Sequence, residues 1–144
     1  MTSPPFHVGD FVWCAFPESE HPARPSRQLH VSYVLAASAD QAIVAYTTSR
    51  PLRHAAGRPG VIYFSAEQAA DLGQKRAFWL HLWRVARLPV TRAWFPHLSD
   101  PTNMMVGRVS QTMRRALEAK TKEVFSRHRL ETEQLGPLRP RGAE

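Results

Sequence analysis

The sequence predicts a mainly β fold with some α: a small, partly open β-barrel with one short helix and one C-terminal helix packed outside it. Several short runs of β-branched and aromatic residues are separated by loops that contain Pro and Gly. One short segment carries a helix-capping pattern, and a later stretch has a helical apolar period. With 144 residues, of which 43% are hydrophobic, the chain is long enough for one domain with its own core.

The chain is expected to begin with a loose arm, residues 1–7, followed by a first strand over Phe11–Phe16. Within that strand we expect Trp13 to face the core. The segment Pro17–Gln28 contains three prolines and has no apolar period, so it is predicted to be a long loop. Loops of about a dozen residues between strands are often functional.

The central element is expected to be a β-hairpin. Two apolar runs, Val31–Ala37 and Ala42–Thr48, flank a polar tetrad at 38–41, which is the pattern of two strands with a four-residue loop. Both runs are nearly apolar on both faces, so the pair should lie in the middle of a sheet, with Val44 in the core. The second strand should end before Pro51, which cannot donate to a ladder.

A second loop, basic and flexible, is expected over residues 52–60, followed by a short strand at Val61–Phe64. A helix should follow. Ser65 and Gln68 have the spacing of a capping box, and Gly73 can close the helix as its C′ residue, so the helix is predicted over Ala66–Leu72.

The run Phe78–Leu88 is rich in aromatic and β-branched residues. A strand is favoured, because of this composition and the closing Pro89, over an amphipathic helix, in which Trp79, Leu82 and Trp83 would share a face. Residues 91–95 should add a turn or a short strand.

The last element should be a helix capped by Ser110. Its apolar stripe is predicted to contain Met113, Ala116, Leu117 and Val124, with the stem of Lys120. Arg114, Arg115, Lys122 and Arg127 should lie off that stripe. The domain is therefore expected to span residues 8–129, followed by a flexible basic tail at 130–144.

Charge is distributed unevenly along the chain, whose formal net charge is +7. Residues 1–50 hold three arginines against four carboxylates, whereas residues 51–144 hold sixteen Lys and Arg against eight carboxylates. Such asymmetry favours a polyanionic partner: nucleic acid, an acidic protein or a membrane surface. The alternative is a solvated basic surface without a specific partner. The start has no signal-peptide pattern and no apolar run is long enough to span a bilayer, so a soluble, cytoplasmic protein without membrane contact is expected.

Several chemistries find little support. The single cysteine, Cys14, lies in an apolar strand and is expected to be a buried, inert thiol. No Cys and His are spaced as in a zinc site, and no Gly-rich phosphate loop is present, so neither a metal nor a cofactor is predicted. Trp79 and Trp83 could stack on bases, but core or dimer-interface positions are favoured.

Four motifs occur in an order and spacing that resemble the MazF/PemK/Kid family of toxin ribonucleases, in its PemK-like branch. These motifs are Gly9–Pro17, Val44–Ser49, Val85–Pro89 with Trp94-Phe95 after it, and Gly107–Val109. The resemblance implies an SH3-like barrel, a homodimer, and metal-independent cleavage of single-stranded RNA that leaves a 2′,3′-cyclic phosphate. It also implies a toxin–antitoxin system in which an acidic antitoxin protein is the partner.

The family carries its catalytic arginine in an Arg-Pro at the start of the second strand, where this chain has His30-Val31. The predicted catalytic residues are therefore His30 for proton transfer, Arg27 as the displaced cation and Thr48 as the motif-matched hydroxyl. The predicted substrate-binding residues are Arg24, Thr47, Ser49, Arg50 and Arg53. An alternative function is that of an inactive barrel of the same fold that binds nucleic acid or protein.

Overall fold

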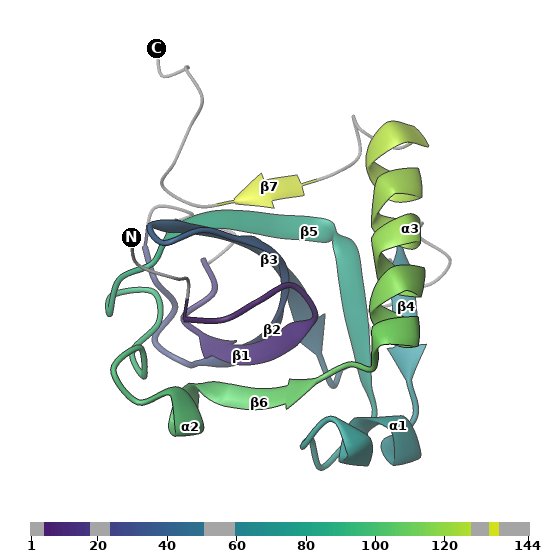
Figure 1. The fold of residues 1–144 in the computed structure, drawn as a ribbon, viewed down its shortest axis with the longest axis horizontal. Coiled ribbons are helices and arrows are strands. Elements are labelled where there is room, and N and C mark those ends of the chain that lie inside the picture. The colour runs from purple at the N-terminus through teal and green to yellow at the C-terminus, as the bar shows by residue number, and fades with distance from the viewer. Residues whose placement is uncertain (1–4, 18–23, 51–59, 128–132, 136–144) are drawn as a thin grey trace.

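A computed structural model of the chain describes residues 5–17, 24–50, 60–127 and 133–135. Most of the strands form one antiparallel sheet in the order β4-β5-β3-β2-β1-β6, and β7 pairs in parallel with β5 (Figure 1). The strands are β1 (Asp10–Cys14), β2 (His30–Ala37), β3 (Gln41–Thr48), β4 (Val61–Phe64), β5 (Phe78–Pro89), β6 (Met105–Arg108) and β7 (Glu133–Leu135). The helices are α1 (Ala66–Asp71), α2 (Pro101–Met104) and α3 (Gln111–Arg127). A mainly β fold with helices is thus confirmed.

The hairpin formed by β2 and β3 lies in the middle of the sheet, as predicted. Its turn is held by Ser38, whose backbone N–H donates to the carbonyl of Gln41 (2.8 Å) and whose hydroxyl donates to Asp40 (2.9 Å). Val44, at the centre of β3, is completely buried. Because both faces of this hairpin are covered, its nearly continuous apolar sequence is the pattern of a central strand pair.

The strand β5 bends sharply, and its bend curls the sheet (Figure 1). Ala45 of β3 lies opposite Val85, but the next residue, Tyr46, lies opposite His81, so three residues of β5 have no partner on β3. Such a bulge increases twist and redirects a strand. The path nevertheless does not close, since β4 pairs only with β5 and β6 only with β1 among the described strands. The helical alternative for this segment is wrong.

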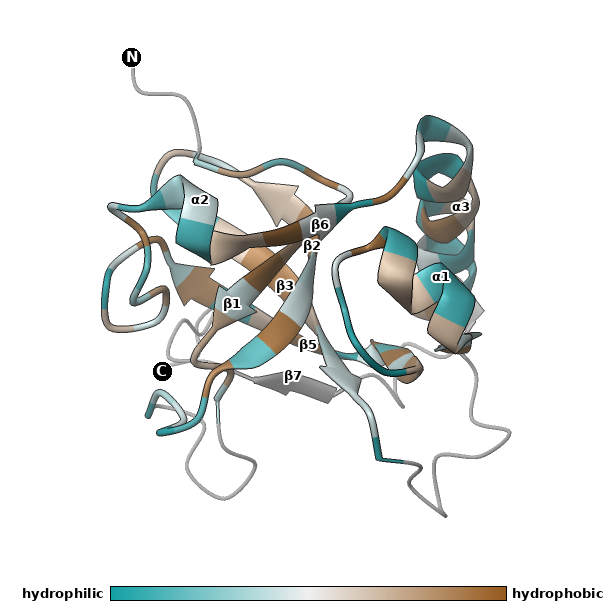
Figure 2. Cartoon of the chain, turned by 90° about the horizontal axis from the view of Figure 1, so that it is seen from below, coloured by the Kyte–Doolittle hydropathy of each residue, from teal (hydrophilic) through white to brown (hydrophobic). Residues whose placement is uncertain are grey.

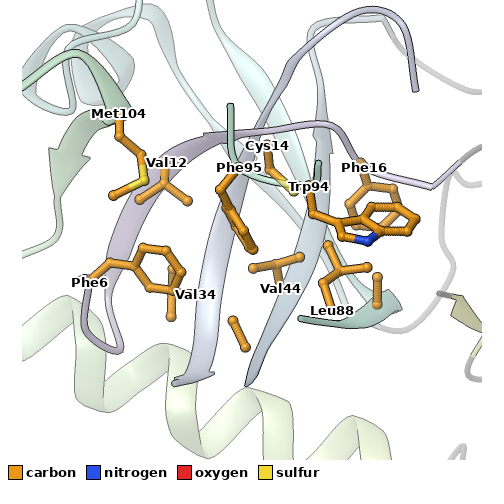
Figure 3. Packing of buried hydrophobic residues seen from close by; sticks show 12 residues of the cluster. Phe6, Val12, Cys14, Phe16, Val34, Val44, Leu88, Trp94, Phe95 and Met104 are labelled. Carbon is orange, nitrogen blue, oxygen red and sulfur yellow. The ribbon is translucent and has the colours of Figure 1, made fainter. Parts of the chain in front are cut away.

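Buried apolar side chains form two main clusters on opposite faces of the sheet. One contains Phe6, Val12, Cys14, Val34, Val44 and Phe95 among others (Figure 3). The other is covered by α1 and α3, which lie on the same side of the sheet (Figure 2). It contains Phe11, Tyr33, Phe64, Phe78, Leu80 and Leu117 among others. Within the predicted N-terminal arm, Phe6 is fully buried with its ring centroid 5.0 Å from that of Phe95. The chain is therefore anchored to the sheet from Phe6 onward.

The prediction that Trp13 faces the core is wrong, because its side chain is 36% exposed. Trp13 shares a face of β1 with Phe11. The rings of Phe64 and Phe78 cover Phe11 at centroid distances of 6.1 and 5.5 Å. Trp13 lies two residues farther along β1 and instead lines an open groove, described below.

The two longer helices begin at the predicted caps. In α1 the Ser65 hydroxyl accepts from the Gln68 N–H (3.2 Å) and the Gln68 side chain accepts from the Ser65 N–H (2.9 Å), which completes the capping box. The Ser110 hydroxyl accepts from the Met113 N–H (3.1 Å) at the start of α3. Helix α2 and strand β6 were not predicted from the sequence, nor was β7.

The buried stripe of α3 differs from the predicted one. Leu117 and Val124 are buried and Met113 is half-buried, but Ala116 is exposed. Arg114, predicted to lie off the stripe, is half-buried, because its methylene stem lies beside Gly9, which has no side chain to exclude it. The helix contacts the sheet along one narrow line with an arginine stem at its edge.

Two glycines bring the end of α1 against β6. A Cβ on Gly73 would meet the carbonyl oxygen of Val106, and a Cβ on Gly107 would meet the backbone of Leu72. Gly73 also has a φ of +76°, the left-handed conformation of a C′ residue. This docking fixes where the chain leaves α1.

Candidate functional site

An open groove of about 640 Å³ lies where β2 begins and β3 ends. The segment between α1 and β5 forms another wall, and single residues of β1 and β6 complete it. The groove is lined by Trp13, Gln28, Leu29, His30, Val31, Tyr46, Thr47, Thr48, Ser49, Arg50, Gly73, Gln74, Lys75, Arg76, Phe78 and Val106. The end of β3, where the sequence predicts a reactive site, therefore lies at a groove.

The end of β3 is fixed by its own hydroxyls. Thr47 is buried, and its hydroxyl donates to the backbone carbonyl of Val31 on β2. The Thr48 hydroxyl accepts from the backbone N–H of Arg50 (3.1 Å) and so shapes the turn after the strand. Ser49 and Arg50 are exposed. Thr47 thus ties the two strands together, while Thr48, Ser49 and Arg50 present polar atoms to the groove.

His30 begins β2 and is half-buried at the groove wall. Burial lowers the pKa of its imidazole below the usual 6.5; a backbone hydrogen bond at Gln28 opposes this shift, and the positive charge of Arg84 adds to it. A lowered pKa keeps the imidazole neutral near pH 7. A neutral imidazole has a lone pair that can accept a proton, which is the role of a general base.

A column of aromatic rings supports His30 from behind. The His30 ring centroid lies 5.5 Å from that of Tyr46, and Tyr46 in turn lies 5.6 Å from His81. The guanidinium carbon of Arg84 stands 4.4 Å over the Tyr46 ring, within cation–π range. The bulge in β5 pairs His81 with Tyr46, and the guanidinium of Arg84, one of the residues without a partner on β3, still reaches the Tyr46 ring. This column limits the movement of the Tyr46 and His30 rings at the groove.

Three permanent cations line the groove: Arg50, Lys75 and Arg76, all exposed. No Asp or Glu occurs among the described residues that line it. The groove is therefore positive, and a phosphodiester would enter it without repulsion from a lining carboxylate. Gln74, Lys75 and Arg76 were not predicted from the sequence. The available signal was the basic pair Lys75-Arg76, which Gln74 alone separates from the C′ glycine Gly73.

The structure brings together five of the predicted site residues: His30, Thr47, Thr48, Ser49 and Arg50. Arg24 and Arg27 are exposed and are not among the residues that line the groove. Arg53 lies outside the described residues. The cations that reach the groove come from the end of β3 and from the α1–β5 segment rather than from the described part of the predicted first loop.

The remaining aromatic and thiol predictions concern positions away from the groove. Trp83 is buried with its ring stacked on His81 (5.4 Å), which confirms a core position. Trp79 is half-buried and packs on exposed Tyr63 (5.0 Å). Cys14 is fully buried, and burial raises the pKa of its thiol to about 12, so the thiol is inert as predicted.

No protein-family model matches this chain, and no curated protein matches it. Across the described part of the chain, the His, Cys, Asp and Glu side chains form no group of three or more that could hold a metal ion. Nor is any described helix both long and apolar enough to cross a bilayer. The function must therefore be argued from the groove itself.

Proposed function

We propose that this chain is a metal-independent endoribonuclease of the MazF/PemK type, a toxin of a toxin–antitoxin pair that cleaves single-stranded RNA. The observation that carries the proposal is a groove in which a histidine with a lowered pKa lies with three permanent cations and no lining carboxylate. The proposal includes a partly open SH3-like barrel, a cytoplasmic location, a homodimer and an acidic antitoxin protein that competes for the groove.

The chemistry requires a base for the 2′-hydroxyl and cations for the phosphorane. In the proposed reaction, neutral His30 takes the 2′-hydroxyl proton and the 2′ oxygen attacks the adjacent phosphorus. Arg50 and Arg76 hold the non-bridging oxygens, because a guanidinium stays charged and binds phosphate bidentately. The bond from phosphorus to the 5′ oxygen breaks, and this oxygen takes a proton from solvent. The products are a 2′,3′-cyclic phosphate and a 5′-hydroxyl.

Thr48 supports the reaction through Arg50. Its hydroxyl accepts from the Arg50 N–H, so it fixes the turn that carries the guanidinium. Arg27 is exposed outside the groove, and the role of displaced cation passes in this proposal to Arg76. His30 in place of the family's arginine then combines a base on β2 with cations from other segments.

The test is incubation of the purified protein with a mixed single-stranded RNA in the presence of EDTA. Cleavage with 2′,3′-cyclic phosphate ends is expected for the wild type and should be lost in His30→Gln. His97→Gln is the matched control, since His97 does not line the groove. Cleavage by His30→Gln at the wild-type rate would exclude His30 as the base.

A second candidate is a barrel of the same type that binds RNA or protein without cleaving it. It is favoured by one feature, the occurrence of His30-Val31 at the position of the family's Arg-Pro. A wild type that binds RNA but leaves it intact would support this alternative. The variant with both His30→Arg and Val31→Pro is then the restoring test, and a gain of cleavage would identify the missing group.

A further inference from the structure

A nucleobase subsite next to the phosphate-binding part of the groove is the strongest inference beyond cleavage. We propose that Trp13 stacks on one unpaired base of a single-stranded RNA and that Gln74 reads the edge of that base. The inference rests on the proposed function in that it assumes an RNA ligand, but it concerns recognition rather than cleavage.

The first observation is the exposure of Trp13. An indole that is 36% exposed in a strand whose other residues are buried is unusual, because aromatic side chains contribute most when covered. Val31, its partner on β2, and Val106 on β6 also line the groove. These side chains leave an apolar surface open to a flat ligand, which is the surface that bases stack on in single-strand binding proteins.

The second observation concerns Gln74. Its Nε2 atom is buried and has no hydrogen-bond partner within the described part of the chain. The backbone N–H of Gln74 donates to the carbonyl of Ala69 (2.8 Å), and the preceding Gly73 is docked on Val106. These contacts fix the backbone at Gln74, and its carboxamide offers one donor group and one acceptor, the combination that a base edge pairs with. Because Gln74 lines the groove, we assign this unpaired amide nitrogen to an acceptor on a bound base.

The third observation is the alternation of side chains at the end of the hairpin. Trp13 and Val31 are opposite each other, whereas Cys14 is opposite His30, so Trp13 and His30 belong to opposite faces of the sheet. Both nevertheless line the same groove. An RNA strand that crosses the end of β2 can therefore place a base on Trp13 and the neighbouring phosphodiester at His30 and Arg50.

The experiment measures binding without cleavage. The probe is a fluorescently labelled 2′-O-methyl RNA 12-mer, which lacks the attacking hydroxyl, compared with the same oligomer made abasic at every position. The wild-type full chain should bind the intact oligomer about five- to a hundredfold more tightly. Trp13→Ala should make the two affinities equal, and Trp13→Phe should keep most of the preference. Trp79→Ala, outside the groove, is the matched control and should match the wild type.

Gln74 is tested by the ranking of four homopolymer 12-mers. The wild type should prefer one base, and Gln74→Ala should flatten the ranking without changing the dependence of affinity on salt. A circular-dichroism melt shows that each variant is folded. A wild type that binds intact and abasic oligomers equally, or a Trp13→Ala that keeps the preference, overturns the stacking inference. A ranking unchanged in Gln74→Ala overturns base reading by Gln74.

Cleavage is scored separately on an unmodified RNA. If the wild type cleaves RNA but does not distinguish abasic from intact oligomers, the subsite is wrong and the proposed function stands. If the wild type shows base preference without cleavage, the nuclease is wrong and the subsite stands. If the wild type neither binds nor cleaves RNA, both the base subsite and the proposed nuclease function are wrong.

Discussion

Two basic segments flank the central hairpin, and they differ in what holds them. The first contains Arg24 and Arg27, which are exposed and away from the groove. The second, Gln74–Arg76, follows a helix with a complete capping box and lines the groove with all three residues. The difference is that packing at the end of α1 fixes the position of the second segment beside the groove. Amino-acid composition alone does not distinguish the two segments, because each contains two basic residues.

The contrast is sharpest in the backbone contacts. In the described part of the first segment, Pro25 bridges to Pro17 and the Ser26 N–H reaches the Ala15 carbonyl at 3.4 Å, a long hydrogen bond. The second segment is held by Gly73 against β6 and by the Gln74 N–H on α1. If RNA binds in the groove, the second segment would therefore be the better preorganised of the two for phosphate contacts.

The largest expected effect comes from removing the cations of each segment in turn. Lys75→Ala with Arg76→Ala should weaken RNA binding by about 3 kcal/mol, because each of these exposed cations should contribute the lower end of the roughly 1.5–3 kcal/mol of a charged hydrogen bond. The slope of log affinity against log salt should become shallower by about 1.4, since each phosphate contact on a single strand contributes about 0.7. Arg24→Ala with Arg27→Ala is the matched pair, with the same loss of charge and a smaller loss of affinity. Fluorescence anisotropy titrations at several salt concentrations measure both.

An equal loss in the two double variants would mean that the first segment also reaches the RNA. It would keep Arg27 as the displaced cation predicted from the sequence. A larger loss for Arg24 and Arg27 would reverse the comparison and move the phosphate site to the first segment.

The next effect concerns the docking of the second segment. Gly107→Ala places a methyl group against the Leu72 backbone and should lower the free energy of unfolding by about 1–3 kcal/mol, the usual cost of overpacking. It should also weaken RNA binding, because Lys75 and Arg76 move with the end of α1. Chemical denaturation and anisotropy measure the two effects. If Gly107→Ala is destabilised but binds RNA normally, the docking of α1 against β6 does not position Lys75 and Arg76 for binding.

The parts of the fold that follow a local pattern could be predicted from the sequence. The hairpin, Val61–Phe64 and the Ser65 capping box depend on alternation and on contacts three residues apart, and the structure shows each of them. The long β5 was predicted as a strand, but its bend was not. That bend depends on how β5 pairs with β3, which no local pattern encodes.

Only the site residues at the ends of the hairpin strands could be predicted from the sequence. The residues from His30 to Arg50 gather because the hairpin brings its two ends together. Trp13 was wrongly predicted to face the core, because the alternation of side chains along β1 does not show that Phe64 and Phe78 cover Phe11 and leave Trp13 exposed. Gln74 and Arg76 were missed because their position depends on contact between Gly73 and Val106, two residues from distant parts of the chain.

A smaller effect is expected at the strand end that faces the second segment. Thr48→Ala removes the acceptor for the Arg50 N–H and should lower stability by about 0.5–1.5 kcal/mol, the usual net value of one hydrogen bond. The activation free energy of RNA cleavage should rise by more than this loss of stability, since Arg50 loses its fixed turn. Ser49→Ala is the control in the adjacent exposed position. Identical cleavage rates for both variants would show that the turn does not position Arg50.

The smallest effect on stability concerns His30, whose pKa is lowered mainly by burial. Above pH 6.5 the imidazole is neutral in both the folded and the unfolded chain, so its contribution is fully present. Below pH 6.5 the unfolded chain binds the proton first, and stability is lost as pH falls toward the folded pKa. The loss should stay below about 1.4 kcal/mol per pH unit, the limit for one proton. The difference in unfolding free energy between wild type and His30→Gln should therefore be flat above pH 7 and change only in the acid range.

Under the proposed function, the same lowered pKa should set the pH dependence of cleavage. A general base must be neutral to act, so kcat/KM should rise with pH through a value below 6.5 and be level by pH 7. His97→Gln should keep this profile, because His97 lies outside the groove. An acid limb of kcat/KM centred above pH 6.5 would mean that another group is the base, because kcat/KM reports the free enzyme. Such a limb in kcat alone would mean that RNA phosphates raise the pKa of His30 in the complex. The stability difference of His30→Gln checks the pKa of His30 in the free protein. A stability difference that appears only below pH 6.5 while the kcat/KM limb lies above it would exclude His30 as the base.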